Sequence, residues 1–371
     1  MRIATWNVNS IRARVDRVVD WMVREDIDVL AMQEIKCKPE QFPAQAFEDA
    51  GYELAIHGLS QWNGVAFASR HEMTDVATAF PEMPGFLKGE EGPGLPLEAR
   101  ALGVTVNEMR LWSLYVPNGR SLDDPHYVYK LDWLARLKTH AVDELARNPK
   151  LAMALMGDWN VAPLDSDVGD PSLVPGVSTH ISPAERSAFE AFEAAGFTDV
   201  VRPIVPEGFT YWDYKALRFP RNEGLRIDFI LGSPAFGDLV TDASIHRNER
   251  KGDAPSDHVP VLVDLETEDE DDDRPMIFKL SLPSPGARRP SSTIASRCRA
   301  RTSQSVSSRR VRKPIRLITS AASTSARMTP ALRPASSSRV SASPMGPRLC
   351  ALRSFHTEAS TAAKTPRLTR A

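Results

Sequence analysis

The sequence predicts an α/β protein in which strands and helices are layered against each other as a sandwich. Three observations support this prediction: short apolar runs typical of strands recur through the first 266 residues, amphipathic helical patterns separate some of these runs, and other runs follow one another directly. A strict alternation of strand and helix would place a helix after every strand, so the adjacent runs favour a layered sandwich.

The strands are predicted from apolar runs that end at polar or turn-forming residues. In chain order they cover residues 3–8, 27–33, 52–57, 64–69, 102–106, 110–116, 151–156, 225–231 and 259–265. The fifth and sixth runs are joined by Asn107 and Glu108, which predicts a polar turn between neighbouring strands.

Three helices are predicted between these strands. Residues 15–24 carry a helical stripe of apolar residues, and residues 126–147 form a longer amphipathic pattern that Asn148-Pro149 ends. Residues 182–195 begin with Ser182-Pro183-Ala184-Glu185, in which a serine and a glutamate stand three positions apart as in a capping box, with proline between them.

Charge divides the chain into an acidic body and a basic end. Residues 1–267 carry 26 Lys and Arg against 41 Asp and Glu, whereas residues 274–371 carry 20 Lys and Arg against Glu358 alone. The end is rich in Ser, Arg, Ala and Pro and keeps two aromatic residues, so it lacks the apolar surface that a packed core requires. We expect a folded domain over residues 1–266 and a disordered, acidic-then-basic tail over residues 267–371.

The tail has two interpretations. A basic arm that binds nucleic acid is one, and a passenger segment without function is the other. The second is favoured because the last predicted strand already ends at Leu265 and the tail shows no periodicity.

Cysteine and hydropathy patterns set the expected compartment. Cys37, Cys298 and Cys350 are too few and too widely spaced for a disulfide framework or a thiolate metal site, which favours a reducing compartment. There is no leader pattern at the start, and no apolar run approaches the ~20 residues of a membrane span. We expect a soluble, cytoplasmic monomer without a membrane partner.

Five polar clusters stand at or near the ends of predicted strands, where open α/β sheets tend to bind ligands. Each is weak alone, because an Asn that closes a strand is usually a turn former and a Glu there is usually solvated. An acidic residue at position 228 is harder to dismiss, since it falls in an apolar run and a buried carboxylate needs a partner. The clusters are Asn7, Gln33-Glu34, Asp158-Trp159-Asn160, Arg226-Ile227-Asp228 and Ser256-Asp257-His258.

Together the clusters supply the residue types that hydrolysis of a phosphodiester needs. Carboxylates hold a hard divalent cation, a further acceptor aims the attacking water, and neutral or cationic donors meet the charge that develops. The candidate residues of the metal site are Asn7, Glu34, Asp158, Asn160, Asp257 and His258.

Within this set the residues take different expected roles. Glu34 and Asp257 are the main metal ligands, and Asp158 aims the water, while the two asparagines and His258 act as donors. Asp228 is expected to fix the tautomer of His258 and to favour its protonated form, through a hydrogen bond of about 2.6–3.2 Å.

Five motifs occur in order along the first 266 residues: Trp6-Asn7-Val8-Asn9, Gln33-Glu34-Ile35-Lys36, Gly157-Asp158-Trp159-Asn160, Gly224-Leu225-Arg226-Ile227-Asp228 and Ser256-Asp257-His258-Val259-Pro260. In order and approximate spacing they resemble the exonuclease III family of abasic-site endonucleases, part of the endonuclease/exonuclease/phosphatase superfamily. The resemblance does not include the tail. It implies a four-layer α/β sandwich of two packed mixed β-sheets flanked by helices, a Mg²⁺ cofactor that Mn²⁺ can replace, and roles that match those above.

Two further residues take their expected roles beside these motifs. Tyr115, in Ser-Leu-Tyr-Val-Pro-Asn-Gly, matches the family's active-site tyrosine, which orients or stabilises the phosphate. Asn118 follows in the same loop and is a candidate contact to that phosphate. Taken without the resemblance, Tyr115 would be interpreted as a core aromatic of its strand.

A last pair concerns the choice of substrate. Residues 209–214 and 222–228 resemble the segment that forms the repair enzymes' pocket for a baseless sugar, with Trp212 and Leu225 as walls of an apolar slot. The alternative is that the aromatics here are ordinary sheet residues, because strict alternation places Trp212 on the opposite face from Tyr211.

The resemblance implies a hydrolase of DNA repair. It would cut double-stranded DNA at abasic sites and 3′ ends, as an AP endonuclease, 3′–5′ exonuclease and 3′-phosphatase. The alternatives are a phosphatase or lipid phosphodiesterase of the same superfamily and a non-catalytic DNA-binding relative, against which the intact set of carboxylates argues. The acidic body is a mild argument against nucleic acid, whereas basic residues near the motifs favour it.

Overall fold

The structure is a computed structural model that describes residues 1–90 and 92–266. These residues belong to one compact unit. The predicted disordered tail lies outside the described residues. Within the described residues, all nine predicted strands and all three predicted helices are confirmed, with ends that shift by at most three residues.

The first sheet is mixed. Its β1 and β2 run parallel, and the other neighbouring strands are antiparallel. Its spatial order is β11 (Val240–Ile245), β12 (Val261–Leu265), β1 (Arg2–Asn7), β2 (Val29–Gln33), β4 (Val65–Ser69) and β3 (Glu53–His57).

The second sheet is also mixed, with β7 and β8 parallel and the remaining pairs antiparallel. Asn107 and Glu108, which join two of its strands, both adopt positive φ angles, as tight two-residue hairpin turns require. Its spatial order is β5 (Thr74–Ala77), β6 (Ala101–Val106), β7 (Met109–Tyr115), β8 (Met153–Asp158), β10 (Asp228–Gly232) and β9 (Thr198–Asp199).

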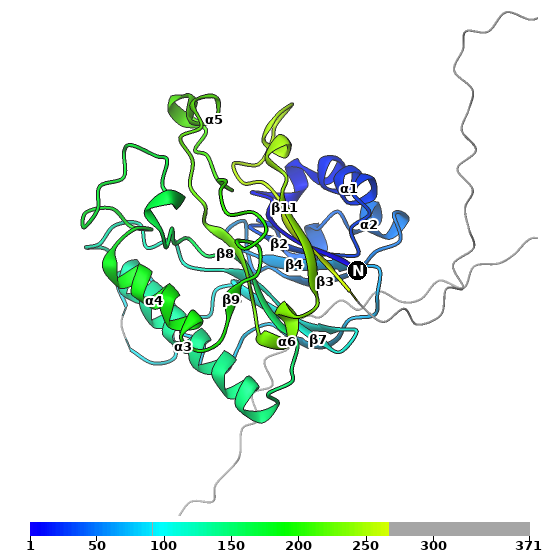
Figure 1. Ribbon diagram of the computed structural model, residues 1–371, viewed down its shortest axis with the longest axis horizontal. Coiled ribbons are helices and arrows are strands. Elements are labelled where there is room, and N and C mark those ends of the chain that lie inside the picture. The colour runs from blue at the N-terminus through cyan, green and yellow to red at the C-terminus, as the bar shows by residue number, and fades with distance from the viewer. Residues whose placement is uncertain (91, 267–371) are drawn as a thin grey trace, which may run out of the picture. The chain divides into compact units, whose positions relative to one another are not determined.

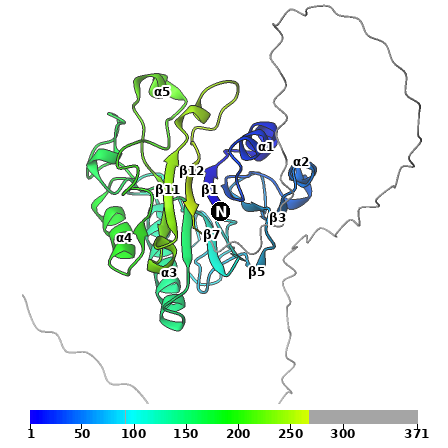
Figure 2. The ribbon, with the colours of Figure 1, turned by 45° about the vertical axis from the view of Figure 1, so that its right-hand side comes forward.

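Helices cover the outer faces of both sheets, which gives the four layers that the resemblance implies. On one side α1 (Val15–Arg24) and α2 (Ala44–Asp49) pack on the first sheet, and on the other α3 (Pro125–Arg147) and α4 (Pro183–Glu193) pack on the second (Figures 1 and 2). The remaining short helices are α5 (Arg218–Arg221), α6 (Pro234–Gly237) and the 3-10 turns Ile11–Ala13, Pro39–Gln41, Asp165–Asp167, Lys215–Leu217 and Arg247–Arg250.

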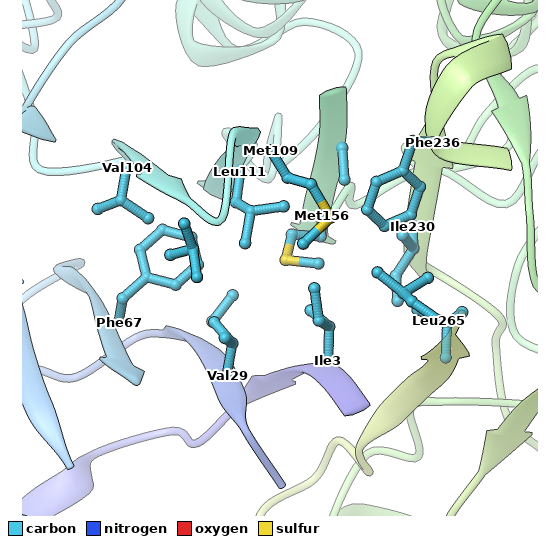
Figure 3. Close-up of a cluster of buried hydrophobic side chains, with 14 of the residues drawn as sticks. Ile3, Val29, Phe67, Val104, Met109, Leu111, Met156, Ile230, Phe236 and Leu265 are labelled. Atoms are coloured by element: carbon cyan, nitrogen blue, oxygen red, sulfur yellow. The ribbon is translucent and has the colours of Figure 1, made fainter. Parts of the chain in front are cut away.

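The central core lies between the two sheets. Apolar side chains from the inner face of each sheet interdigitate there, and full burial of each contributes about 1.5–3 kcal/mol. Figure 3 shows Ile3, Val29, Phe67 and Leu265 of the first sheet facing Val104, Leu111, Met156 and Ile230 of the second. No helix among the described residues combines the length and apolar character needed to cross a membrane.

Two features differ from the sequence-based expectation. Three outer strands, β5, β9 and β11, are not predicted, because β5 and β9 are short and β11 carries exposed polar side chains in its first half. The strand expected at 225–231 begins only at Asp228, because the backbone of Leu225 bonds to Tyr211 in a separate bridge instead of joining the sheet. Asp228 is therefore the first residue of β10, at the edge where the other polar clusters stand.

Candidate active site

Strand register aligns three of the predicted residues side by side at the ends of neighbouring strands of the second sheet. Tyr115 is the partner of Asp158 across β7 and β8, and Asp158 is the partner of Asp228 across β8 and β10. Gly157 permits this close packing, because a side chain at that position would meet the Leu114 carbonyl oxygen at 2.0 Å. The strand register alone therefore places Tyr115, Asp158 and Asp228 next to one another.

Asn7 joins this edge to the first sheet. Its Nδ2 donates to Glu34 Oε1 and to Asp158 Oδ2, at 2.9 Å each. Glu34 leaves β2 with a φ angle of 51°, a left-handed conformation that is uncommon outside glycine and often found at functional sites. The Ser256 hydroxyl donates to the Asn7 carbonyl at 2.7 Å, which ties the Ser-Asp-His segment to the same place.

Glu34, Asp158 and His258 form a group that could hold a metal ion. Each offers one ligand atom, and these atoms all lie within 4.8 Å of one another. Burial works against the charged form of Glu34, but Lys36 and Asn7 lower its pKa overall, so it stays ionised. Asp257 is not part of this group of three, and its Oδ1 accepts a hydrogen bond from Asn9 Nδ2 at 2.9 Å.

Asp158 sits in a crowded negative environment. Burial raises its pKa, His258 lowers it, and the charges of Asp228 and Glu34 raise it, so that the net pKa is about 7. Its Oδ1 accepts from the backbone N–H of Asn160 at 2.9 Å, which fixes the carboxylate in place. A carboxyl group with this pKa exchanges a proton near neutral pH, as a general base must.

The predicted bond between His258 and Asp228 is confirmed. His258 Nδ1 lies 2.8 Å from Asp228 Oδ2 and 3.1 Å from Oδ1. Burial disfavours a charged ring, but Asp228 and Asp158 outweigh it and raise the pKa of His258 to about 10. In the metal-free site the ring is therefore protonated at neutral pH, and in this form it is a cation beside the carboxylates and not a metal ligand. Its Nε2 lies 3.7 Å from Asp158 Oδ2, and the Tyr211 ring packs against it.

Tyr115 lies half-buried beside the carboxylates. Burial and the charge of Glu34 raise the pKa of its phenol well above 10, so the hydroxyl keeps its proton and can donate it in a hydrogen bond. The guanidinium of Arg100 stacks on the ring at 4.7 Å, and Glu98 holds that guanidinium at 2.6 Å.

Asn118 and Asn160 meet at the other side of Asp158, and the structure adds His180, which sequence reasoning missed. Asn118 Nδ2 lies 3.1 Å from Asn160 Oδ1 and 3.1 Å from His180 Nε2. His180 Nε2 lies 3.1 Å from Asn160 Oδ1 as well. His180 follows a loop with no periodic pattern, so no strand end or motif in the sequence marks it. Burial and the charge of Lys130 lower its pKa to about 4, which keeps the ring neutral.

The two residues expected to wall an apolar slot are buried. Trp212 is 0% exposed and packs edge-on against Phe219 and Phe209, and Leu225 is 4% exposed. Tyr211, which precedes Trp212 in the chain, packs against the His258 ring instead. The two aromatic side chains therefore have different neighbours. Their role in the slot stays a prediction, and it requires the segment to expose these side chains when a substrate binds.

Comparison with known proteins places this geometry in a family. Residues 4–258 match the Endonuclease/Exonuclease/phosphatase family. The chain is 28% identical to exodeoxyribonuclease III of Haemophilus influenzae over 275 residues, which is 71% of this chain and 100% of that protein.

Two solved structures are similar over the same region. One is the 3′ phosphatase NExo from Neisseria bound to a product DNA hairpin, with 35% identity, a TM-score of 0.65 and coverage of 72% of this chain and 100% of that one. The other is an AP endonuclease from Archaeoglobus fulgidus, with 32% identity, a TM-score of 0.64 and the same coverage. The chain therefore belongs to the Endonuclease/Exonuclease/phosphatase family, and within it to the exonuclease III branch.

Proposed function

We propose that this protein is a Mg²⁺-dependent nuclease that hydrolyses DNA phosphodiesters at abasic sites and 3′ ends. The observation that carries the proposal is the convergence of Glu34, Asp158 and His258, whose ligand atoms lie within 4.8 Å of one another at the edges of two packed sheets. Two carboxylates that can hold a cation and a protonated imidazole supply the charges that hydrolysis of a negatively charged ester requires.

A divalent cation fits this group. Glu34 and Asp158 supply carboxylate oxygens, the ligands that Mg²⁺ and Mn²⁺ prefer. The raised pKa of Asp158 reflects burial and unbalanced negative charge, which a bound cation would relieve. Such an ion would polarise the phosphoryl oxygens and stabilise the leaving oxygen. Asp257, expected beside Glu34, would join through a shift of its side chain from Asn9.

The protein's own groups take complementary roles. Asp158, held by Asn7 and by the backbone N–H of Asn160, is placed to orient the attacking water and to accept its proton. His258 brings a fixed positive charge to the phosphate, held in place by Asp228. Tyr115 supplies a neutral hydrogen-bond donor for a phosphate oxygen. Asn118 would supply a second by turning its amide away from Asn160 and His180.

DNA is proposed as the substrate from the relatives and from the surface. The three similar proteins are named as an exodeoxyribonuclease, a 3′ phosphatase with a DNA hairpin and an AP endonuclease. Arg12, Arg14 and Lys36 lie around the loop after β1, where arginine side chains could contact the phosphates of DNA although the body of the chain is acidic. We further propose that the enzyme acts as a monomer in the cytoplasm.

The test compares substrates. Purified protein with Mg²⁺ is incubated with a duplex carrying one abasic site, a duplex with a 3′ phosphate, an undamaged duplex and an inositol phosphate. We expect cleavage of the abasic and 3′-phosphate duplexes. Preferred hydrolysis of the inositol phosphate would instead identify a phosphatase of the same fold, and binding of DNA without any cleavage would identify a non-catalytic relative.

A further inference from the structure

A buried ion pair connects the two helices behind the active site. Lys130 on α3 and Glu185 on α4 are each 0% exposed, and Lys130 Nζ lies 2.5 Å from Glu185 Oε1. Replacing a buried ion pair by apolar side chains is often neutral or stabilising, so stability alone gives little reason for this one. Its other contacts suggest a different use.

Lys130 also donates hydrogen bonds to backbone carbonyls of two active-site loops. Nζ donates to the Asn160 carbonyl oxygen at 2.6 Å and to the Asn118 carbonyl oxygen at 3.3 Å. An ammonium group has three N–H donors, so Lys130 is fully committed to Glu185 and these two loops. Loop carbonyls buried at this depth need such a partner, because no strand or helix satisfies them.

Glu185 holds a third loop. Its Oε1 accepts from Thr179 Oγ1 at 2.7 Å and from the backbone N–H of His180 at 2.9 Å, while Oε2 accepts from Ser182. The Thr179 hydroxyl also lies 3.1 Å from the Asn118 carbonyl oxygen, so it links the first loop to the third. One buried carboxylate therefore sets the position of residues 179–182.

Each of the three loops carries one side chain of the same cluster. Asn118, Asn160 and His180 approach one another at 3.1 Å in all three pairs, and the Asn160 backbone N–H bonds to Asp158. The cluster thus stands beside the residue that would activate water. None of the three side chains is on a strand or helix that could fix its place alone.

We propose that Lys130 and Glu185 are positioning residues that fix Asn118, Asn160 and His180 as one surface for the reacting phosphate. We call this pair the Lys130–Glu185 clamp. The proposal rests on the proposed phosphodiesterase function. Its physical basis is that misplacing a reactive arrangement by 1 Å can cost roughly 100-fold in rate, so loops without regular structure need a rigid anchor.

The test removes both charges of the pair and keeps side chains of similar size. Lys130→Met/Glu185→Gln removes both charges, and the single side-chain oxygen of Gln keeps an acceptor for the N–H group of His180. We expect a melting temperature within roughly 5 °C of wild type, with kcat on an abasic duplex at least tenfold lower and KM changed by less than about threefold. Thr179→Val, a milder change of the same network, should lower kcat by about threefold.

Leu137→Ala is the matched control. Leu137 is buried on the same helix but faces the apolar layer between α3 and the second sheet, so its loss should lower the melting temperature and leave kcat of the folded enzyme unchanged. Wild-type kcat in the double variant, or in Thr179→Val if the double variant does not fold, would overturn the clamp.

An equal loss of kcat in Leu137→Ala would also overturn it, because the effect would then be general destabilisation. The wild-type enzyme separates the two proposals. If wild type cleaves no DNA, the proposed function fails and the clamp fails with it. If wild type cleaves DNA and the variants match it, only the clamp fails.

Discussion

At the scale of single residues, His258 illustrates how neighbours decide the charge of a buried ring. Burial alone would leave the ring neutral, as it does for His180 on the other side of Asp158. The carboxylate of Asp228, 2.8 Å from the His258 ring, raises the pKa of that ring instead. One site therefore holds a cationic imidazole and a neutral one. The two histidines can therefore serve different roles although their side chains are chemically the same.

Asp228→Asn tests this arrangement. An amide keeps the shape but removes the negative charge, so the pKa of His258 should fall from about 10 toward its ordinary value, and kcat should drop by about 100-fold. Because the ring then loses its proton at lower pH, the alkaline limb of the activity profile should also move to lower pH. NMR titration of the His258 ring in metal-free protein measures the shift. Asp264→Asn, on the first sheet, is the control. An unchanged pKa would mean that Asp158 alone sustains the charge.

Trp212→Ala tests the proposed slot for a baseless sugar. Abasic cleavage should fall at least tenfold, about 1.4 kcal/mol, while hydrolysis of a small activated phosphodiester changes far less, since that substrate does not enter a slot. Trp133→Ala on α3 controls for the lost packing. Because Trp212 is fully buried, an equal fall in both activities would identify it as a core residue that shapes the segment from behind.

At the scale of elements, sequence periodicity predicts the inner strands and the long helices well. Inner strands such as β8 are buried along their whole length. The capping box of α4 forms as its residues suggest, because the Glu185 backbone N–H donates to Ser182 Oγ at 3.2 Å and the Ser182 backbone N–H donates to Glu185 Oε2 at 3.1 Å. The strands β5, β9 and β11 escape prediction because outer strands bury only one face or are very short.

The same reasoning explains what the sequence reveals of the site. Asn7, Glu34 and Asp158 are predictable because each stands at, or directly after, the end of a strand that is visible in the pattern. His180 and the Lys130–Glu185 clamp are not, because their partners lie up to 62 residues away and are brought together by the packing of α3 on α4. Local patterns carry no information about contacts of that kind.

The first turn of α3 gives a prediction for pH. His126 Nδ1 accepts from the Gly119 backbone N–H at 3.1 Å, and burial, with Arg100 and Arg120 nearby, lowers its pKa to about 4. An unfolded histidine titrates near 6.5, so between about pH 6.5 and 4 the unfolded chain binds a proton that the folded chain does not. Stability contributed by neutral His126 is therefore present above pH 6.5 and lost as the pH falls toward 4.

His126→Gln removes this titration but keeps an acceptor for Gly119. Between pH 7 and pH 5 the melting temperature of the variant, measured by circular dichroism, should fall less than that of wild type. Equal losses in both proteins would show that His126 does not contribute to acid sensitivity.

At the scale of the whole molecule, the described domain closes on itself at its last strand. The backbone N–H of Leu265 bonds to the Met1 carbonyl and that of Glu266 to the Leu239 carbonyl, so the two ends of residues 1–266 meet in the first sheet. The domain boundary at residue 266 stays a prediction from the sequence.

A chain that ends at Glu266 tests that boundary. It should melt at the same temperature as the full chain and keep its kcat, because the last paired strand is complete. Its affinity for DNA should be lower at low salt only, since Lys and Arg contacts to phosphate weaken as salt rises. A large drop in melting temperature would show that residues beyond 266 stabilise the domain.

The most direct test of the account is the metal dependence of cleavage in Glu34→Gln. The substitution keeps the shape of a proposed metal ligand and removes its charge. Abasic cleavage at limiting Mg²⁺ should fall by more than about 100-fold, because even residues that only support a metal ligand contribute about 10–100-fold. High Mg²⁺ or Mn²⁺ should restore part of the activity, and EDTA should abolish cleavage by wild type. Wild-type cleavage that survives EDTA, or unchanged turnover of Glu34→Gln at limiting Mg²⁺, would contradict a metal-assisted reaction at this site.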